Sequence, residues 1–183
     1  RGERRDALTQ TIDLAPTLLD FFGKPIPPDM RGHSLLPVIR ENAPGHAYAL
    51  FGYFNGPINI TDGQYVYMRA RVDDAVQMHH YTMMPTAMDN RLPVERLQNA
   101  EFAAPFAFTK GCPTFRIPVP AQNTKLPRGG HRLYNLVVDP KQTQPIEEKE
   151  TEARLLRAMG QLLAENDAPE AIYAAYGIPK PEK

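Results

Sequence analysis

The stretch from Thr11 to Ile39 constrains the fold of this chain most strongly, because it holds the most regular pattern of apolar residues, prolines and glycines. Four of its large apolar side chains recur at the spacing of one helical face: Leu14, Leu18, Leu19 and Phe22. An apolar stripe of this width is stable only when another part of the protein covers it. We therefore predict a helix here whose apolar face is buried.

Both ends of this helix are marked in the sequence. Asp13 has the residue type of an N-cap, and Gly23 supplies the left-handed conformation that commonly ends a helix. Three prolines follow, at positions 25, 27 and 28, and they exclude both a helix and a central strand. The chain should cross a surface there until Arg31–Pro37 packs again.

Composition narrows the class of protein. The 183 residues are 42% hydrophobic and 23% charged, which is typical of one globular domain or a small domain with a tail. The 21 basic and 21 acidic residues cancel, so nothing indicates a nucleic-acid or anionic-membrane partner. No apolar run approaches the roughly 20 residues needed to span a bilayer. The single cysteine, Cys112, excludes an intrachain disulfide but leaves the compartment unknown.

A turn cluster at residues 41–45 marks a domain boundary, which divides the chain into residues 1–45 and 46–183. Ala47–Phe54 is predicted to be a buried strand. Ile58–Thr61 and Gln64–Ala70 flank Asp62-Gly63 and predict a hairpin that needs a positive φ at its turn.

The later part of the chain predicts more strands and then helices. We expect a strand at 78–85, a short helix at 93–103, a loop with extended pieces over 105–128 and a strand at Leu133–Val138. An amphipathic helix should follow, with an apolar stripe made of Leu155, Leu156, Met159, Leu162 and Leu163. We expect a short last helix after it, with Asp167 as its N-cap and Gly177 at its end. The predicted fold class is α+β, a small antiparallel sheet of about four strands with a C-terminal helix on one face.

Two motifs resemble a known family. The run Asp-Leu-Ala-Pro-Thr-Leu-Leu-Asp at 13–20, with Gly23 and Arg31-Gly32-x-Ser-Leu-Leu-Pro37, is similar to the segment with which sulfatases of the alkaline-phosphatase superfamily leave their catalytic domain. Leu-Tyr-Asn-Leu at 133–136 and Asp-Pro-Lys-Gln-Thr at 139–143 resemble a late strand and turn of the same family, with Asn135 and Gln142 replacing acidic residues. Residues 72–126 match it only loosely.

The resemblance implies that residues 1–45 are the last helix and linker of a larger α/β catalytic domain, and that 46–183 form the C-terminal subdomain. It implies an enzyme that hydrolyses sulfate esters with a formylglycine and a divalent cation, usually calcium. Both groups would lie upstream, so we expect no cofactor in this chain and no activity from it alone. The implied partners are the N-terminal catalytic domain of the same protein and a sulfated small-molecule or carbohydrate substrate. Any export signal would also lie upstream.

Neither a catalytic nor a metal site is predicted within the chain. Cys112 is followed directly by Pro113 and Thr114, whereas the family nucleophile lies in Cys-x-Pro-Ser-Arg. Asp89-Asn90 spells a pair found in the family metal site, but it comes after the first motif instead of before it. The remaining acidic residues are scattered, and an oxygen-ligand cation needs about six converging donors.

Five residues are candidates for the rim of the substrate pocket: His79, His80, Lys110, Arg116 and Arg128. Arginine and lysine suit an anionic sulfate. Adjacent histidines on a strand face opposite ways and cannot both bind one metal. For all five the alternative is structural: one histidine packed and one exposed, and solvated charges on loops. We assign no function to His33 or His131.

Two alternatives stay open. The alternative within the same superfamily is the end of a phosphonate or phosphate monoester hydrolase, whose closing region is similar. The chain is also compatible with a stand-alone binding module.

Overall fold

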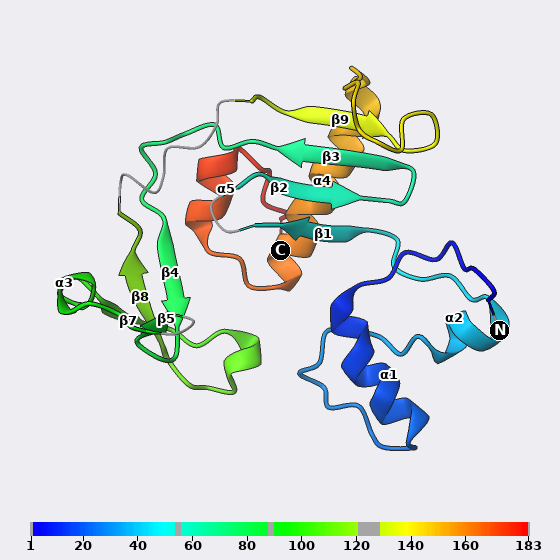
Figure 1. Cartoon of the computed structure of the whole chain (residues 1–183). Helices are drawn as coiled ribbons and strands as arrows, with labels where there is room; N and C mark the ends of the chain where they lie inside the picture. Colours follow the sequence, from blue (N-terminus) through cyan, green and yellow to red (C-terminus); the bar gives the residue numbers. More distant parts are fainter. Residues whose placement is uncertain (1, 54–55, 88–89, 121–128, 183) are drawn as a thin grey trace.

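A computed structural model describes residues 2–53, 56–87, 90–120 and 129–182 (Figure 1). Its centre is a four-stranded antiparallel sheet with the strand order β1-β2-β3-β9. With the helices described below, this sheet confirms the predicted α+β class. The strands are β1 (Ala49–Gly52), β2 (Ile58–Thr61), β3 (Tyr65–Arg69) and β9 (Arg132–Asn135).

The predicted hairpin is β2–β3. Ile58 pairs with Arg69 and Thr61 with Val66, and Gly63 has a φ of +90° in the turn. Oδ1 of Asp62 accepts the N–H groups of Gln64 and Tyr65 at 2.9 and 2.7 Å, which closes the turn. The turn chemistry thus sets the register.

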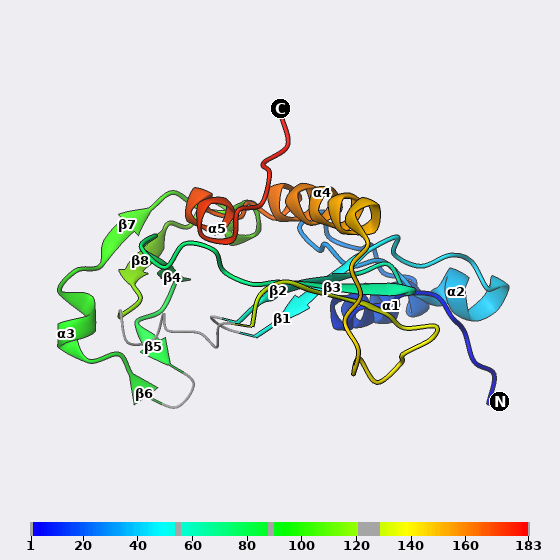
Figure 2. The same ribbon diagram turned by 90° about the horizontal axis from the view of Figure 1, so that it is seen from above.

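One face of the sheet is covered by two helices, α4 (Lys149–Glu165) and α5 (Glu170–Tyr176) (Figure 2). Leu155 and Met159 of α4 have no exposed area, and they pack with Ile60, Tyr67 and Leu133 of the sheet. This confirms the predicted stripe. Gly177 ends α5 with a φ of +55°, as predicted.

Asp167 is not the N-cap of α5, contrary to the prediction, because Pro169 holds that position. The Asp167 carboxylate instead accepts the N–H of Ala107 at 2.8 Å. The Asp167 side chain therefore bonds to a segment distant in sequence and does not cap the helix that follows it.

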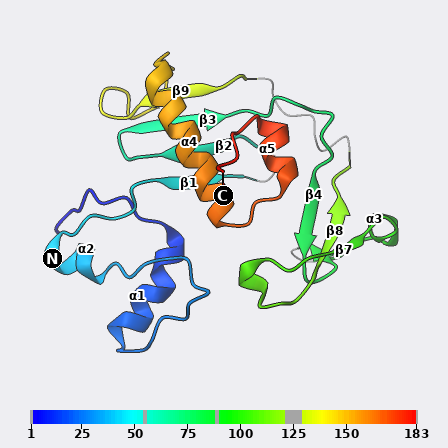
Figure 3. The same cartoon turned by 180° about the vertical axis from the view of Figure 1, so that it is seen from behind.

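A second sheet, not predicted as such, is formed by the middle of the chain in the order β4-β8-β7 (Figure 3). It confirms the strand expected at 78–85 and corrects the helix expected at 93–103, of which only four residues are helical before the chain becomes a strand. The elements are β4 (His79–Thr82), the pair β5 (Thr86–Ala87) and β6 (Asn90–Arg91), α3 (Val94–Leu97), β7 (Glu101–Ala103), the 3-10 turn η2 (Ala107–Thr109) and β8 (Thr114–Pro118).

Two strand predictions need correction. β1 is an edge strand, so only its Ala49 is buried, and Phe51 remains 46% exposed. β9 is shorter than expected, because Asn135 Oδ1 accepts the Val137 N–H and the Asn135 carbonyl accepts the Asp139 N–H. These bonds turn the chain away from the sheet.

Residues 1–45 hold the 3-10 turn η1 (Thr11–Asp13) and the helices α1 (Leu14–Phe21) and α2 (Leu36–Glu41). Gly23 has a φ of +64° after α1, as predicted. The predicted apolar face of α1, however, is not buried within this chain: Leu14 and Leu18 are each 58% exposed and Phe22 is 68% exposed. The inner side of the helix carries Pro16, which is fully buried. No helix of the described residues is long and apolar enough to cross a membrane.

Candidate functional site

A group of ionisable side chains surrounds Asp13, which has no exposed area. Its Oδ2 accepts the Gln10 N–H at 2.7 Å and its Oδ1 accepts the His33 N–H at 2.9 Å. Nε2 of His46 lies 2.9 Å from both carboxylate oxygens. Asp13 thus joins the start of α1, the loop after the prolines and the segment that leads into β1.

Asp13 holds the N-cap position of α1, as predicted. Its side chain makes no capping bond to α1, and it reaches back to Gln10 and across to His33 and His46 instead. Burial would raise the pKa of this carboxyl, but the bonds from the His33 and Gln10 backbone and from His46 lower it below its usual value. Asp13 is therefore a carboxylate at neutral pH.

Two glycines allow the three segments to approach. A Cβ on Gly32 would lie 2.1 Å from the Ile12 carbonyl oxygen, and one on Gly45 would lie 2.3 Å from that of Leu8. The Thr17 hydroxyl accepts the Leu35 N–H at 2.8 Å, and the Ser34 hydroxyl donates to Asp20 at 2.5 Å. The motif residues at 13–20 and 31–37 therefore bind each other.

The rings of His33 and His46 complete the cluster. Their centroids are 5.0 Å apart, and one ligand atom from each of Asp13, His33 and His46 lies within 4.8 Å of the others. His33 is exposed and His46 is half-buried. Sequence reasoning missed this group because its members are 20 and 13 positions apart on three different segments. The local signal was that His33 and His46 each directly follow a glycine, Gly32 and Gly45.

The predicted rim histidines both lie on β4, in the second sheet. His79 pairs with Pro118 and His80 with Ile117, so their side chains point to opposite faces. Burial lowers the pKa of both, and the charges of Arg116 for His79 and Arg96 for His80 lower it further. Both rings are therefore neutral at neutral pH and suit hydrogen bonding better than charge pairing. His79 also lines a pocket of about 470 Å³ with Leu50, Met78 and Tyr176.

The two described rim cations, Lys110 and Arg116, pair with different acidic side chains. Lys110 pairs with Asp29 at 3.0 Å, and Arg116 pairs with Glu101 across β8 and β7. Arg128 lies outside the described residues. Two of the described candidates lie close together, because the charge of Arg116 helps to lower the pKa of His79.

A larger cavity, of about 610 Å³, was not predicted. Asn59 and Met68 line it, and they alternate with Ile60 and Tyr67, so the cavity opens on the sheet face away from α4. Arg71, His131 and Arg132 also line it. The Arg71 side chain is only 2% exposed and donates to the carbonyls of Asp73 and Val76. This cavity combines an apolar floor with basic side chains.

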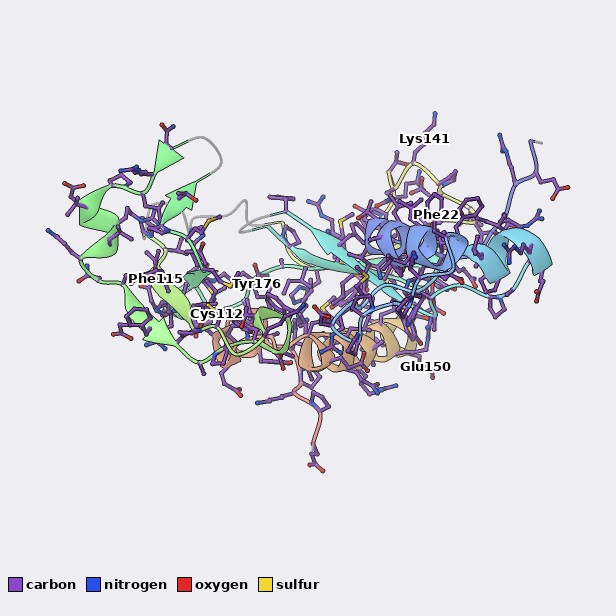
Figure 4. The ribbon with its side chains drawn as sticks, turned by 90° about the horizontal axis from the view of Figure 1, so that it is seen from below. Phe22, Cys112, Phe115, Lys141, Glu150 and Tyr176 are labelled. Carbon is purple, nitrogen blue, oxygen red and sulfur yellow. The ribbon has the colours of Figure 1, made fainter. Side chains whose placement is uncertain are left out.

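The rejected nucleophile, Cys112, is an exposed residue after η2. Figure 4 places Cys112 and Phe115 at the end of the molecule that holds the second sheet, away from Phe22. Of the pair Asp89-Asn90, Asp89 is outside the described residues and Asn90 belongs to β6.

Part of the chain matches a known protein family. Residues 1–89, just under half of the chain, match the family model of N-sulphoglucosamine sulphohydrolase, C-terminal. No curated protein matches the chain.

Solved structures extend the likeness beyond residue 89. One is a 4S-sulf protein described with the metabolism of multiple glycosaminoglycans by Bacteroides thetaiotaomicron; the match covers 91% of this chain and 29% of that one, with 18% identity and a TM-score of 0.51. Another was solved with its substrate D-glucosamine-2-N,6-O-disulfate, with 15% identity over 87% of this chain and 24% of that one and a TM-score of 0.46. This chain thus spans less than a third of each structure. The family match and the fold shared with the first structure confirm the resemblance of this chain to the C-terminal region of a sulfatase.

Proposed function

We propose that this chain is the C-terminal part of an enzyme that hydrolyses sulfate esters, and that it acts together with an α/β catalytic domain of the same polypeptide. The observation that carries the proposal is the exposed apolar face of α1, which lies within the segment that matches the family model. The formylglycine and the divalent cation belong, in this proposal, to the catalytic domain.

The surface for that domain is the side of the molecule away from α4. Leu14, Leu18 and Phe22 expose apolar area on α1, and Val137 and Val138 after β9 are 72% and 77% exposed. Figure 4 shows Phe22 and Lys141 on one side of the sheet, with Glu150 of α4 on the other. Soluble proteins seldom leave such side chains grouped in water, because each 100 Å² of apolar area that is buried contributes about 2.5 kcal/mol.

In this proposal the chain also supplies part of the rim of the substrate pocket. Lys110 and Arg116 already pair with acidic side chains, and His79 and His80 are neutral, so none of these offers a free positive charge at neutral pH. The cavity lined by Arg71, Asp74 and Arg132 adds two guanidinium groups, of which that of Arg71 pairs with Asp74, on the side of the sheet that faces the proposed docking surface. We propose that this cavity belongs to the rim together with His79 and His80.

The docking surface can be tested on the 183-residue chain with the dye bis-ANS, which fluoresces on exposed apolar surface. Leu18→Asp with Phe22→Asp should lower the dye fluorescence while leaving the thermal melt unchanged, because both side chains are exposed. Val94→Asp on α3 is the matched control, since Val94 is also 68% exposed but lies at the other end of the molecule. Equal fluorescence in the double variant and the unaltered chain would contradict a docking surface on α1.

A further inference from the structure

The cluster of Asp13, His33 and His46 has the composition of a transition-metal site. Zinc in proteins is bound by imidazole nitrogens at about 2.0–2.1 Å and carboxylate oxygens at about 2.0–2.2 Å, usually four in a tetrahedron. Two nitrogens and one oxygen lie within 4.8 Å of one another here. From these distances we propose that Asp13, His33 and His46 bind a zinc ion, with a water molecule as the fourth ligand.

The carboxylate is already prepared for this role. The Gln10 and His33 N–H groups occupy one lone pair on each Asp13 oxygen, so the remaining lone pairs are directed at His46. Hydrogen bonds to a ligand from outside the coordination sphere fix its orientation, and here the backbone supplies them.

The change in geometry needed is small. Two ligand atoms of a tetrahedral zinc ion are about 3.4 Å apart, as follows from bond lengths near 2.1 Å. Nε2 of His46 and the Asp13 oxygens are 2.9 Å apart, so this pair would open slightly when both bound the ion, with the imidazole proton of His46 on Nδ1. His33 is exposed on a loop, and its ring can rotate to complete the site.

The choice of zinc follows from the ligands. Calcium takes six to eight oxygen ligands and magnesium keeps an octahedron of oxygens, and neither demand is met by two imidazoles and one carboxylate. A bound zinc ion would hold together the start of α1, the loop at Gly32 and the segment that leads into β1. The inference stands on this cluster alone and does not depend on the proposed sulfatase function.

The test is calorimetric titration of the whole 183-residue chain, freed of metal with a chelator, with zinc chloride at about pH 7.5, since zinc binds histidine in competition with protons. We expect saturable binding of one zinc per chain, a higher melting temperature with zinc and the visible absorption of a tetrahedral site when cobalt(II) is used instead. Calcium and magnesium chloride should give neither binding heat nor a shift in melting temperature.

Variants separate this site from adventitious binding. His33→Ala and His46→Ala should each weaken zinc binding by more than about tenfold, the least that is usually lost when even an outer-shell partner is changed. His79→Ala, which lies outside the cluster, should bind zinc like the unaltered chain. His33 is exposed, so its variant should fold normally, and a melt without metal checks this. Absence of saturable zinc binding, or equal binding by His33→Ala and the unaltered chain, would overturn the proposal.

Discussion

Nε2 of His46 lies 2.9 Å from both carboxylate oxygens of Asp13, which closes a span of 33 residues. The Asp13 carboxylate also accepts two backbone N–H groups. The beginning of α1 is thereby fixed to the segment that enters the central sheet. This junction fixes the exposed face of α1 relative to the central sheet. In the proposed enzyme, the junction therefore sets where the catalytic domain docks.

Asp13→Ala should destabilise the chain by at least about 2 kcal/mol, because it leaves buried N–H groups without an acceptor and removes a hydrogen-bonded charge. The free energy of unfolding in urea, measured with a chelator present, is the readout. Asp6→Ala is the control, since Asp6 is exposed and should change little. Equal stability of the two variants would contradict a structural role of Asp13.

Gly32→Ala tests the close approach of the loop to η1. The added Cβ would lie 2.1 Å from the Ile12 carbonyl oxygen, so the backbone must shift, at a cost of about 1–3 kcal/mol. In Gly129→Ala the new Cβ would meet the end of the flexible Arg132 side chain at 3.0 Å, which can move aside. The two urea midpoints should therefore differ, and a Gly32→Ala variant as stable as the Gly129→Ala variant would show that the loop does not approach η1 so closely.

Leu155 and Leu18 form a matched pair for the core. Leu155 has no exposed area and Leu18 is 58% exposed. Leu155→Ala should cost about 2–5 kcal/mol, because it leaves a cavity between α4 and the sheet. Leu18→Ala should remain within about 0.5 kcal/mol of the unaltered chain. Thermal melts of both variants check this, and a large loss from Leu18→Ala would mean that α1 is covered within this chain.

Acid should weaken the ion pair between Asp62 of the β2–β3 hairpin and Arg154 of α4. Burial would raise the pKa of Asp62, but the Tyr65 N–H, the Arg154 guanidinium at 2.7 Å and the Gln64 N–H lower it below its usual value. A carboxyl group whose pKa is lowered by folding stabilises the folded state at pH values above its pKa in the unfolded chain, which is near 3.9. That stabilisation is lost as the pH falls through the pKa of the same group in the folded state. Urea midpoints between about pH 6 and pH 3 should thus fall less steeply for Asp62→Asn. Parallel curves for the variant and the unaltered chain would exclude this contribution.

Local signals predicted the elements that are governed by local chemistry. Asp62-Gly63 predicted the hairpin because the turn is closed by its own residues, and the stripe from Leu155 to Leu163 predicted α4 because its face packs on one sheet. Gly23 and Gly177 ended their helices as predicted.

Sequence alone did not reveal features that depend on distant contacts. Asp13 and Asp167 both have the residue type of an N-cap, but each bonds to a segment far along the chain. In the second sheet, β4 pairs with β8 across more than 30 residues, and no local pattern specifies such pairing. The metal-type cluster and the cavity at Asn59 were missed for the same reason.

We proposed above that this chain is part of a sulfatase whose chemistry lies in another domain. Turnover of an aryl sulfate by the pure 183-residue chain with calcium present tests it most directly, with Cys112→Ala as the control for the one cysteine. We predict no turnover above the rate in buffer for either protein. Calcium-dependent turnover by the unaltered chain, lost in Cys112→Ala, would contradict the claim and place the nucleophile within these residues.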